Sequence, residues 1–167
     1  MTGYLLDTNA VSDWLIDTKP RHPAVRAKIA SLPADSPLLT SVIVLGEIEY
    51  GLRVDRDNQP TLEPFRERVR QELPHVLTVE KATADVYGGL RAKLFDKFTP
   101  KGKRKGPRPE QLVDPVTSLA LGIQENDLWI AAQAIERNLV LVSNDGMKRI
   151  RDVAPELRVE DWGQSKL

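Results

Sequence analysis

Four carboxylates of this chain stand where the surrounding sequence is apolar or has just completed a predicted strand. They are Asp7, Glu47, Asp127 and Asp145. An ionised carboxylate that faces a core is costly unless it is paired or bound to a metal. No Lys or Arg lies within the four motifs, except Lys148 just after the last one. Such a cluster is typical of a site for a hard divalent cation, Mg²⁺ or Mn²⁺, which takes oxygen ligands.

Asp7 and Asp145 each follow a predicted strand. Asp7 comes directly after the apolar run Tyr4–Leu6, and Asp145 comes shortly after residues 139–143, the clearest strand pattern in the chain. In an open α/β sheet, ligands bind beyond the carboxyl ends of the strands. We therefore expect these two strands to be neighbours, so that the two carboxylates share one pocket.

Glu47 and Asp127 belong to predicted helices. Glu47 lies in an otherwise apolar stretch of a helix expected over residues 42–54. Asp127 begins a second expected helix, over residues 127–134. Positions 127, 130, 131 and 134 of that helix share one face, and the last three are apolar. Asp127 is therefore predicted to project from the face that packs inward.

Each of these acids also has an ordinary structural interpretation. Asp7 could cap the first helix, and Asp145 could belong to a simple turn. An acid at a helix start, such as Asp127, interacts favourably with the helix dipole. Glu47 could be an exposed helix residue, with Glu49 facing inward in its place. Taken singly, these interpretations are the better ones, but four such acids in one parallel-sheet protein favour a shared site.

Strands alternate with helices along the whole chain. We expect strands at 4–6, 37–41, 76–79, 139–143 and, more weakly, 157–159, and helices at 10–16, 42–54, 81–98 and 127–134. Thr8 or Asn9 is expected near the cap of the first helix. This alternation predicts an α/β fold, a three-layer α/β/α domain with a central parallel sheet of four or five strands. At 167 residues, the chain has the length of a single domain, 1–167.

Composition excludes several other kinds of protein. The 24 basic and 24 acidic residues cancel, so any positive surface must be local. The absence of Cys excludes disulfide scaffolds and thiolate sites, and two separated His residues argue against a His-rich zinc site. No apolar run approaches the roughly 18 residues of a membrane span, and the first 16 residues lack the basic start of a signal peptide. We therefore expect a soluble cytoplasmic protein that does not bind membranes.

The ordered set of motifs resembles the PIN-domain ribonucleases, and within them the VapC-type toxins of bacterial toxin–antitoxin pairs. The resemblance spans nearly the whole chain and rests on Leu5-Leu6-Asp7-Thr8-Asn9, on Glu47 followed by Tyr50-Gly51, on Asn126-Asp127-Leu128-Trp129-Ile130-Ala131-Ala132, and on Ser143-Asn144-Asp145. It implies a Mg²⁺-dependent endoribonuclease that cleaves single-stranded RNA, with a VapB-like antitoxin as partner and a homodimeric assembly.

The resemblance also assigns roles to individual residues. Asp7 and Asp127 are expected as the main metal ligands, and Glu47 and Asp145 as residues that complete the pocket or hold a second ion. The polar helpers of the family correspond to Thr8, Asn9 and Ser143, with Thr40 or Ser41 as further candidates. Thr8 and Ser143 would orient carboxylates or water through their hydroxyls.

Residues 99–109 depart from the strand and helix pattern and from the short connection typical of the family. The sequence TPKGKRKGPRP reads as a loop, and we expect a basic loop insertion near 99–115; residues 110–123 remain unassigned. Its basic residues are Lys101, Lys103, Arg104, Lys105 and Arg108. By composition alone the loop is a solvated surface segment. Beside a nuclease site, it is equally a candidate contact for the RNA backbone.

Three other functions fit parts of the pattern less well than the nuclease does. A phosphoaspartyl hydrolase of the haloacid-dehalogenase type also has an Asp after its first strand, but requires a second Asp where this chain has Asn9. A nucleotide-binding Rossmann module requires a Gly-rich turn after the first strand, and Asp7-Thr8-Asn9-Ala10 contains no Gly. A PIN fold that only binds partners is disfavoured because all four acids are present. A housekeeping RNA-processing nuclease stays open as an alternative to a toxin.

Overall fold

The computed structural model describes residues 2–55, 59–73, 75–100, 102 and 106–164. Its centre is a sheet of five strands in the order β3-β2-β1-β4-β5, and every strand pair is parallel. The strands are β1 (Tyr4–Leu6), β2 (Leu38–Ser41), β3 (Val76–Leu77), β4 (Val140–Val142) and β5 (Arg158–Glu160). The predicted α/β fold with a parallel sheet is thereby confirmed.

β1 and β4 form the middle of the sheet and are direct neighbours, as predicted. Leu5 pairs with Leu141 and Leu6 with Val142. All these side chains are buried, because both faces of a parallel sheet are covered by helices. The chain places β2 and β3 on one side of β1, then returns to place β4 and β5 on the other. The β1–β4 pair is therefore the point where the strand order reverses, which is where open α/β sheets bind ligands.

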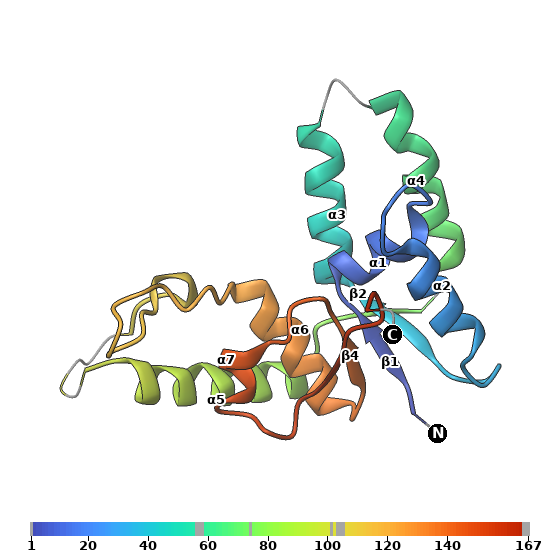
Figure 1. The fold of residues 1–167 in the computed structure, drawn as a ribbon. Helices are drawn as coiled ribbons and strands as arrows, with labels where there is room; N and C mark the ends of the chain where they lie inside the picture. The colour runs from blue at the N-terminus through green and yellow to red at the C-terminus, as the bar shows by residue number, and fades with distance from the viewer. Residues whose placement is uncertain (1, 56–58, 74, 101, 103–105, 165–167) are drawn as a thin grey trace.

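Helices surround this sheet. They are α1 (Thr8–Leu15), α2 (His22–Ala30), α3 (Val42–Val54), α4 (Gln59–Glu72), α5 (Lys81–Phe98), α6 (Glu125–Glu136), α7 (Lys148–Arg151) and the 3-10 helix η2 (Pro109–Gln111). α1, α2, α3 and α4 pack on one another, and α5 packs on α6. In Figure 1, α3 and α4 rise as one arm, while α5 and the segment that follows it form a second arm.

Two helices start at other residues than the sequence predicts, and two further helices were not predicted. α1 is capped by Asp7, whose side chain accepts a hydrogen bond from Ala10 N, so neither Thr8 nor Asn9 is the cap. α6 begins at Glu125, two residues before Asp127, because Gln124 has the extended backbone of a cap and its N–H is bonded by the Asp127 side chain. α2 and α4 were not predicted at all.

The segment after α5 is partly docked on the rest of the protein. Residues 101 and 103–105, and with them Lys101, Lys103, Arg104 and Lys105, lie outside the described residues. Downstream of them, η2 and an antiparallel bridge between Val113 and Ala120 organise the stretch that the sequence left unassigned. Pro109 and Leu112 are buried there. The second half of the expected insertion therefore packs as structure rather than as a solvated loop.

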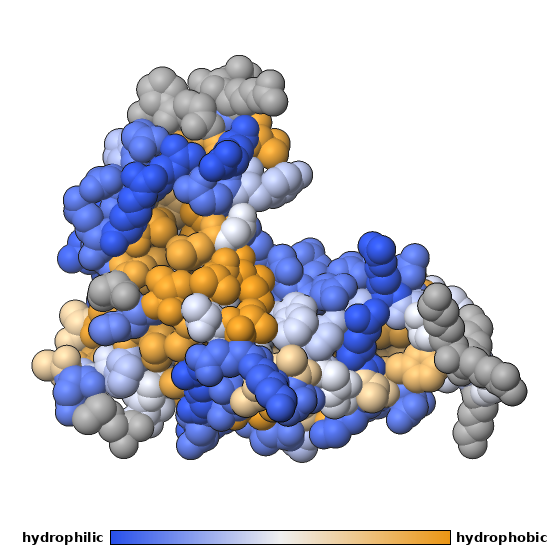
Figure 2. Space-filling view, turned by 180° about the vertical axis from the view of Figure 1, so that it is seen from behind, coloured by the Kyte–Doolittle hydropathy of each residue, from blue (hydrophilic) through white to orange (hydrophobic). Residues whose placement is uncertain are grey.

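Two features of the surface concern partners. Among the described residues, no helix has both the length and the apolar character needed to cross a bilayer. Figure 2 shows the reverse side of the molecule. Apolar side chains gather there where the arm of α3 and α4 meets the rest of the molecule, and polar side chains border them. A contiguous apolar surface with a polar rim is typical of a place where another protein binds.

Candidate active site

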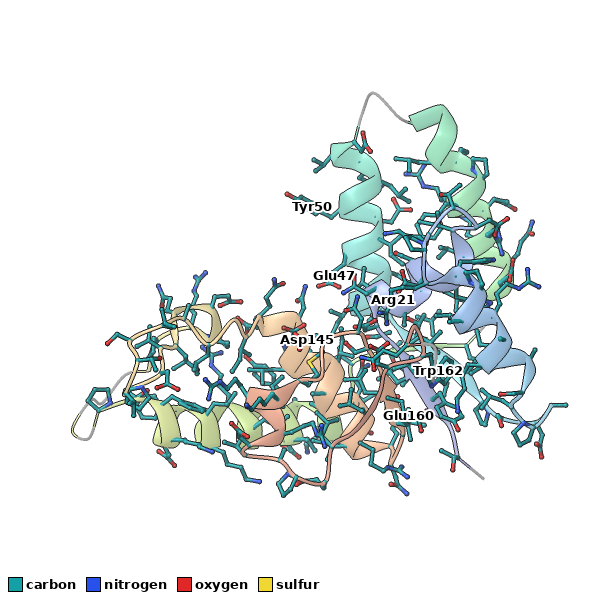
Figure 3. The ribbon with its side chains drawn as sticks, viewed as in Figure 1. Arg21, Glu47, Tyr50, Asp145, Glu160 and Trp162 are labelled. Carbon is teal, nitrogen blue, oxygen red and sulfur yellow. The ribbon has the colours of Figure 1, made fainter. Side chains whose placement is uncertain are left out.

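A pocket of about 770 Å³ opens at the carboxyl ends of β1 and β4, and all four predicted acids line it. Thr8 and Asn9, two of the predicted helper residues, line it as well. Figure 3 shows Glu47 at the foot of α3 and Asp145 on the loop across from it. Residues more than a hundred positions apart in the chain thus face one cavity.

Asp7 is held at the bottom of this pocket by the start of α1. Its backbone N–H donates to Val142 O at 3.1 Å, and its Oδ1 accepts from Ala10 N at 2.7 Å. Only 6% of the residue is exposed. Burial raises the pKa of Asp7 to about 6, the negative charges of Asp127 and Glu47 add to the rise, and hydrogen bonds from Ser143 and Ala10 oppose it.

Asp127 approaches the same space from the first turn of α6. Its Oδ2 accepts a hydrogen bond from Gln124 N at 3.0 Å. Burial raises the pKa of Asp127, and the neighbouring charges of Asp145 and Glu47 raise it further, while the bond from Gln124 lowers it. Asp127 therefore both bonds the backbone at the start of α6 and lines the pocket.

Glu47 is fixed by two uncharged donors. Thr8 Oγ1 donates to one carboxylate oxygen, and Asn126 Nδ2 donates to the other at 2.7 Å. Glu49 instead pairs with Arg66 on α4 at 3.1 Å, and with Arg53, and these contacts lower its pKa. Of the two glutamates, it is Glu47 that faces the pocket.

Asp145 lies in a tight turn after β4. Its N–H donates to Ser143 Oγ at 3.0 Å, and its Oδ1 accepts from Met147 N at 3.1 Å. Met147 has a left-handed backbone with φ of 48°, which turns the chain into α7. The turn interpretation of Asp145 was therefore right in its geometry, and the turn is what directs this acid to the pocket.

The remaining predicted helpers occupy different places. Ser143 is 1% exposed and lies beneath the pocket rather than in its wall, where it bonds both Asp7 and the Asp145 turn. Asn9 Nδ2 donates to Asn144 Oδ1 at 3.2 Å, which links the start of α1 to the loop after β4. Thr40 Oγ1 donates to Leu6 O, and Ser41 Oγ accepts from Ile43 N to cap α3. Thr40 and Ser41 therefore position elements and do not line the pocket.

The pocket is rich in side-chain oxygen atoms that can act as metal ligands, and its described lining contains no Lys, Arg or His. Within the described ranges, no three acidic or His side chains are already drawn together closely enough to hold an ion. Burial raises the pKa of Asp7 and of Asp127, and the charges of the neighbouring pocket carboxylates add to both rises. This donor set fits a hard divalent cation, which would replace mutual repulsion by attraction.

Three neutral polar side chains of the pocket, Tyr50, Gln124 and Asn126, were not predicted as site residues. Asn126 was part of the motif around Asp127, so its position beside that acid was the available signal.

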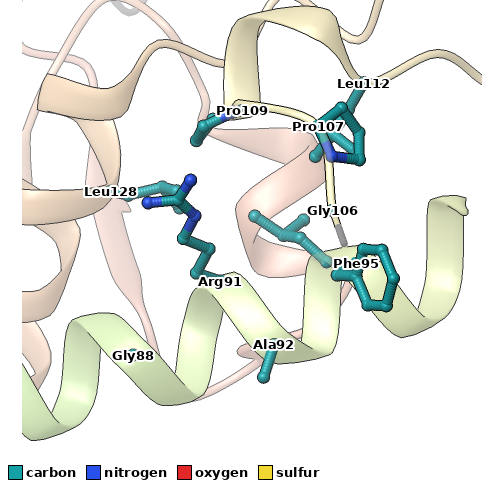
Figure 4. Close-up of a pocket in the computed structure, with 10 residues that line it drawn as sticks. Gly88, Arg91, Ala92, Phe95, Gly106, Pro107, Pro109, Leu112 and Leu128 are labelled. Carbon is teal, nitrogen blue, oxygen red and sulfur yellow. The ribbon is translucent and has the colours of Figure 1, made fainter. Parts of the chain in front are cut away.

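A second cavity, of about 380 Å³, lies between α5 and residues 106–112 and is lined mainly by apolar side chains such as Phe95 and Leu128 (Figure 4). Arg91 is the one charged side chain of its described lining, and none of the four acids is part of that lining.

The model of the PIN domain family matches residues 4–154 of this chain. The chain belongs to the PIN-domain family. A curated relative, "Ribonuclease VapC2" of Rickettsia felis, is 28% identical over 163 residues, which cover 95% of this chain and 97% of the relative. The expected family is thereby confirmed.

Solved structures with the same PIN fold cover nearly the whole chain. One is the VapBC2 structure from Rickettsia felis bound to a DNA fragment from their promoter, with a TM-score of 0.70 and 23% identity over 96% of this chain and 99% of that one. Another is VapBC-1 from nontypeable Haemophilus influenzae, with a TM-score of 0.68 and 21% identity over 98% of this chain and 100% of that one. These similarities concern the fold.

Proposed function

We propose that this chain is a metal-dependent endoribonuclease that cleaves single-stranded RNA, and that it acts as the toxin of a toxin–antitoxin pair. The observation that carries the proposal is the meeting of Asp7, Glu47, Asp127 and Asp145 in one pocket of a PIN domain. The relative named as a VapC2 ribonuclease, which aligns over nearly the whole chain, supports the choice of RNA.

Asp7 and Asp127 are the proposed main ligands of Mg²⁺ or Mn²⁺, with Glu47 and Asp145 completing the pocket or holding a second ion. When bound, the metal would lower the pKa of its water and neutralise charge on the phosphate. The carboxylate oxygens are also the groups of the pocket that can accept the proton of the attacking water. Thr8, Asn9 and Ser143 act one step removed, since Thr8 bonds Glu47, Ser143 supports Asp7, and Asn9 joins α1 to the β4 loop.

Cleavage of a labelled single-stranded RNA by the purified chain tests this function. We expect cleavage with Mg²⁺ or Mn²⁺, none with a chelator, and none in Asp7→Asn or Asp127→Asn. Asp85→Asn is the matched control, because Asp85 is an exposed acid on α5, outside the pocket. RNA cleavage retained in full by Asp7→Asn would reject the site, and no cleavage by the parent would leave a PIN fold that only binds.

Metal binding has a readout that does not depend on activity. Added Mg²⁺ should raise the melting temperature of the parent and of Asp85→Asn, because an ion bound only by the folded state stabilises it. The rise should be lost in Asp7→Asn and in Asp127→Asn. Equal rises in all four proteins would place the metal elsewhere.

We further propose a VapB-like antitoxin as partner, a homodimeric assembly and a cytoplasmic location, where single-stranded RNA is available. The similar structures are VapBC pairs, and the apolar area in Figure 2 offers a surface that a protein could cover.

A gene for a small protein beside this one, whose product inhibits the RNase on co-purification, would support the toxin. An RNase with no such inhibitor would point to housekeeping RNA processing. Light scattering after gel filtration would give the oligomeric state.

A further inference from the structure

Tyr50 is the aromatic side chain in the described lining of the active-site pocket. No packing contact among the described residues accounts for its position. It lies on α3 one turn after Glu47, so both residues share the helix face that lines the pocket. Figure 3 shows Tyr50 above Glu47, directed into the open space between the two arms of the molecule. The residue is 71% exposed.

The other two tyrosines are used in packing. Tyr4 makes an edge contact with Trp162 at 5.0 Å between ring centres, and Tyr87 stacks on Trp129 at 3.8 Å and 3°. Within the described residues, Tyr50 has neither a ring partner nor a hydrogen bond to its hydroxyl. Its ring therefore adds little to the stability of the isolated fold, and a ligand is the better account of its position.

The charge of the pocket indicates what kind of contact that ligand needs. Four carboxylates face an RNA backbone that is itself negative, and the described lining offers no cation. Ionic contacts in the pocket therefore oppose RNA binding in the absence of metal. Stacking of a base on an aromatic ring is uncharged and sequence-tolerant, so it adds affinity at a place where phosphate contacts cannot.

We propose that Tyr50 is the stacking platform for the nucleobase next to the scissile phosphate. The inference rests on the proposed function, because it takes RNA as the substrate. Because Tyr50 lies one helical turn from Glu47 on the same pocket lining, a nucleotide whose phosphate reaches the acids can lay its base against the Tyr50 ring. Gln124 and Asn126 line the same pocket, and the Gln124 amide and the carbonyl oxygen of Asn126, whose Nδ2 already donates to Glu47, can bond the edge of the same base. Tyr50 is in this account a substrate-binding residue.

The test uses the inactive Asp7→Asn protein with Mg²⁺ held constant and a short RNA with or without an abasic position beside the cleavage point. Tyr50→Ala should weaken binding of the intact RNA by roughly 5- to 150-fold, the range of base–aromatic stacking. Tyr50→Phe and Tyr50→Trp should keep the affinity. The loss in Tyr50→Ala should disappear on the abasic RNA. On the intact RNA, the loss of affinity caused by Tyr50→Ala should be equal at low and high salt, since stacking releases no counterions.

Val54→Ala is the matched control, because Val54 is exposed on the same helix one turn further on and does not line the pocket. It should leave RNA binding unchanged. Equal losses on intact and abasic RNA, or a loss in Tyr50→Phe as large as in Tyr50→Ala, would overturn the stacking role. So would a change of oligomeric state in Tyr50→Ala, which would assign the ring to a protein interface. If the parent cleaves RNA while the Tyr50 variants bind it normally, only this inference fails, whereas no cleavage by the parent rejects the proposed function itself.

Discussion

Asp7 combines a structural and a chemical task in one side chain. Its Oδ1 caps α1 through Ala10 N, while its carboxylate is buried beside Asp127 and Glu47. Asn caps helices about as well as Asp does. The substitution Asp7→Asn therefore removes the charge and keeps the cap, which makes it the cleanest change for separating the two tasks.

The pH dependence of stability should report this buried charge. Burial raises the pKa of Asp7 to about 6 from an ordinary 3.8, so between those values the folded protein binds the proton more tightly than the unfolded chain. Stability from this group is therefore highest below about pH 4 and falls as the pH rises towards 6, by about 3 kcal/mol. In metal-free urea unfolding, Asp7→Asn should lack that fall, and it should be more stable than the parent at pH 7. Parallel curves for the two proteins would contradict the raised pKa, with Asp85→Asn as control.

A second buried acid depends on a single cation. Asp13 on α1 is buried, and Arg21 Nε donates to its Oδ2 at 2.9 Å while also pairing with Asp161. Arg21→Met would leave Asp13 buried and unpaired, at a cost of about 3 kcal/mol. Urea unfolding at pH 7 measures this cost, and Asp13→Asn combined with Arg21→Met should recover part of it. Unchanged stability in the single variant would show that water reaches Asp13.

The site acids could be predicted at the residue level because their sequence surroundings conflict with their charge. Asp7 and Asp127 stand out beside buried strands and on an apolar helix face, which is a local signal. The choice of Glu47 over Glu49 could not be settled in the same way. It is decided by Arg66, a residue of α4, whose helix was not predicted. Asn126 was missed because a neutral amide at a helix start has many ordinary explanations.

Among the elements, those with a strong apolar pattern were predicted, and those without it were not. β4, β1, α3 and α5 have apolar runs or a regular apolar face. α4 has a largely charged sequence with Pro64 inside. Among its described side chains only Val69 is buried, together with Leu73 just after the end of the helix. α2 buries His22 and Val25 and little else. Such helices are held by tertiary contacts, which a single sequence does not display.

α5 carries two adjacent glycines that its packing does not require. A methyl group at Gly89 would meet no atom within 4 Å. Gly89→Ala should therefore stabilise the protein by about 0.5–1 kcal/mol, because Ala lowers the entropy of the unfolded chain. Gly122→Ala is the contrasting change: it also meets no atom, but its φ of 70° strains any other residue, so it should destabilise. Melting temperatures of the two variants should move in opposite directions, and a fall for Gly89→Ala would contradict the argument.

The basic stretch before η2 remains a prediction for RNA backbone contact. Four of its five cations lie outside the described residues, and the fifth, Arg108, is exposed. Phosphate contacts release counterions, with a slope of about −0.7 per phosphate for single strands. Replacing Lys103, Arg104 and Lys105 by Ser should make the salt dependence of RNA binding shallower by up to about two units. Parallel salt curves for the loop variant and the parent would end this assignment, and Arg70→Ser on α4 serves as control.

At the scale of the molecule, one sheet joins both arms. β1 is bonded to β2 on the side of the α3–α4 arm and to β4 on the other side. We propose that residues 1–167 form one domain, and that it unfolds in a single cooperative transition. Calorimetry should give one peak whose calorimetric and van't Hoff enthalpies agree. Two resolved peaks would mean that the arms are independent units.

Whole-molecule topology was the most predictable level. Alternating strands and helices predicted the parallel sheet, and the demand that Asp7 and Asp145 share a pocket predicted the β1–β4 neighbourhood, which is confirmed. The arrangement of the two arms could not be predicted, because it depends on α4 and on the docking of residues 106–112. Those contacts are made by scattered side chains such as Pro109 and Leu112, which carry no periodic signal.

The pairing of the first strand with the fourth has a consequence during synthesis on the ribosome. Asn9 and Asn144, which link the two strand ends, are 135 positions apart. At about 5–20 residues per second, Asn9 is therefore synthesised roughly 7 to 27 seconds before Asn144, which directly precedes Asp145, the last acid of the pocket. Throughout that interval the nascent chain has no assembled pocket and cannot cut RNA, the messenger and ribosome beside it included. A prematurely terminated chain that ends before Asp145 also lacks the complete pocket. Under the proposed function, RNA cleavage therefore begins only when nearly the whole chain has been synthesised.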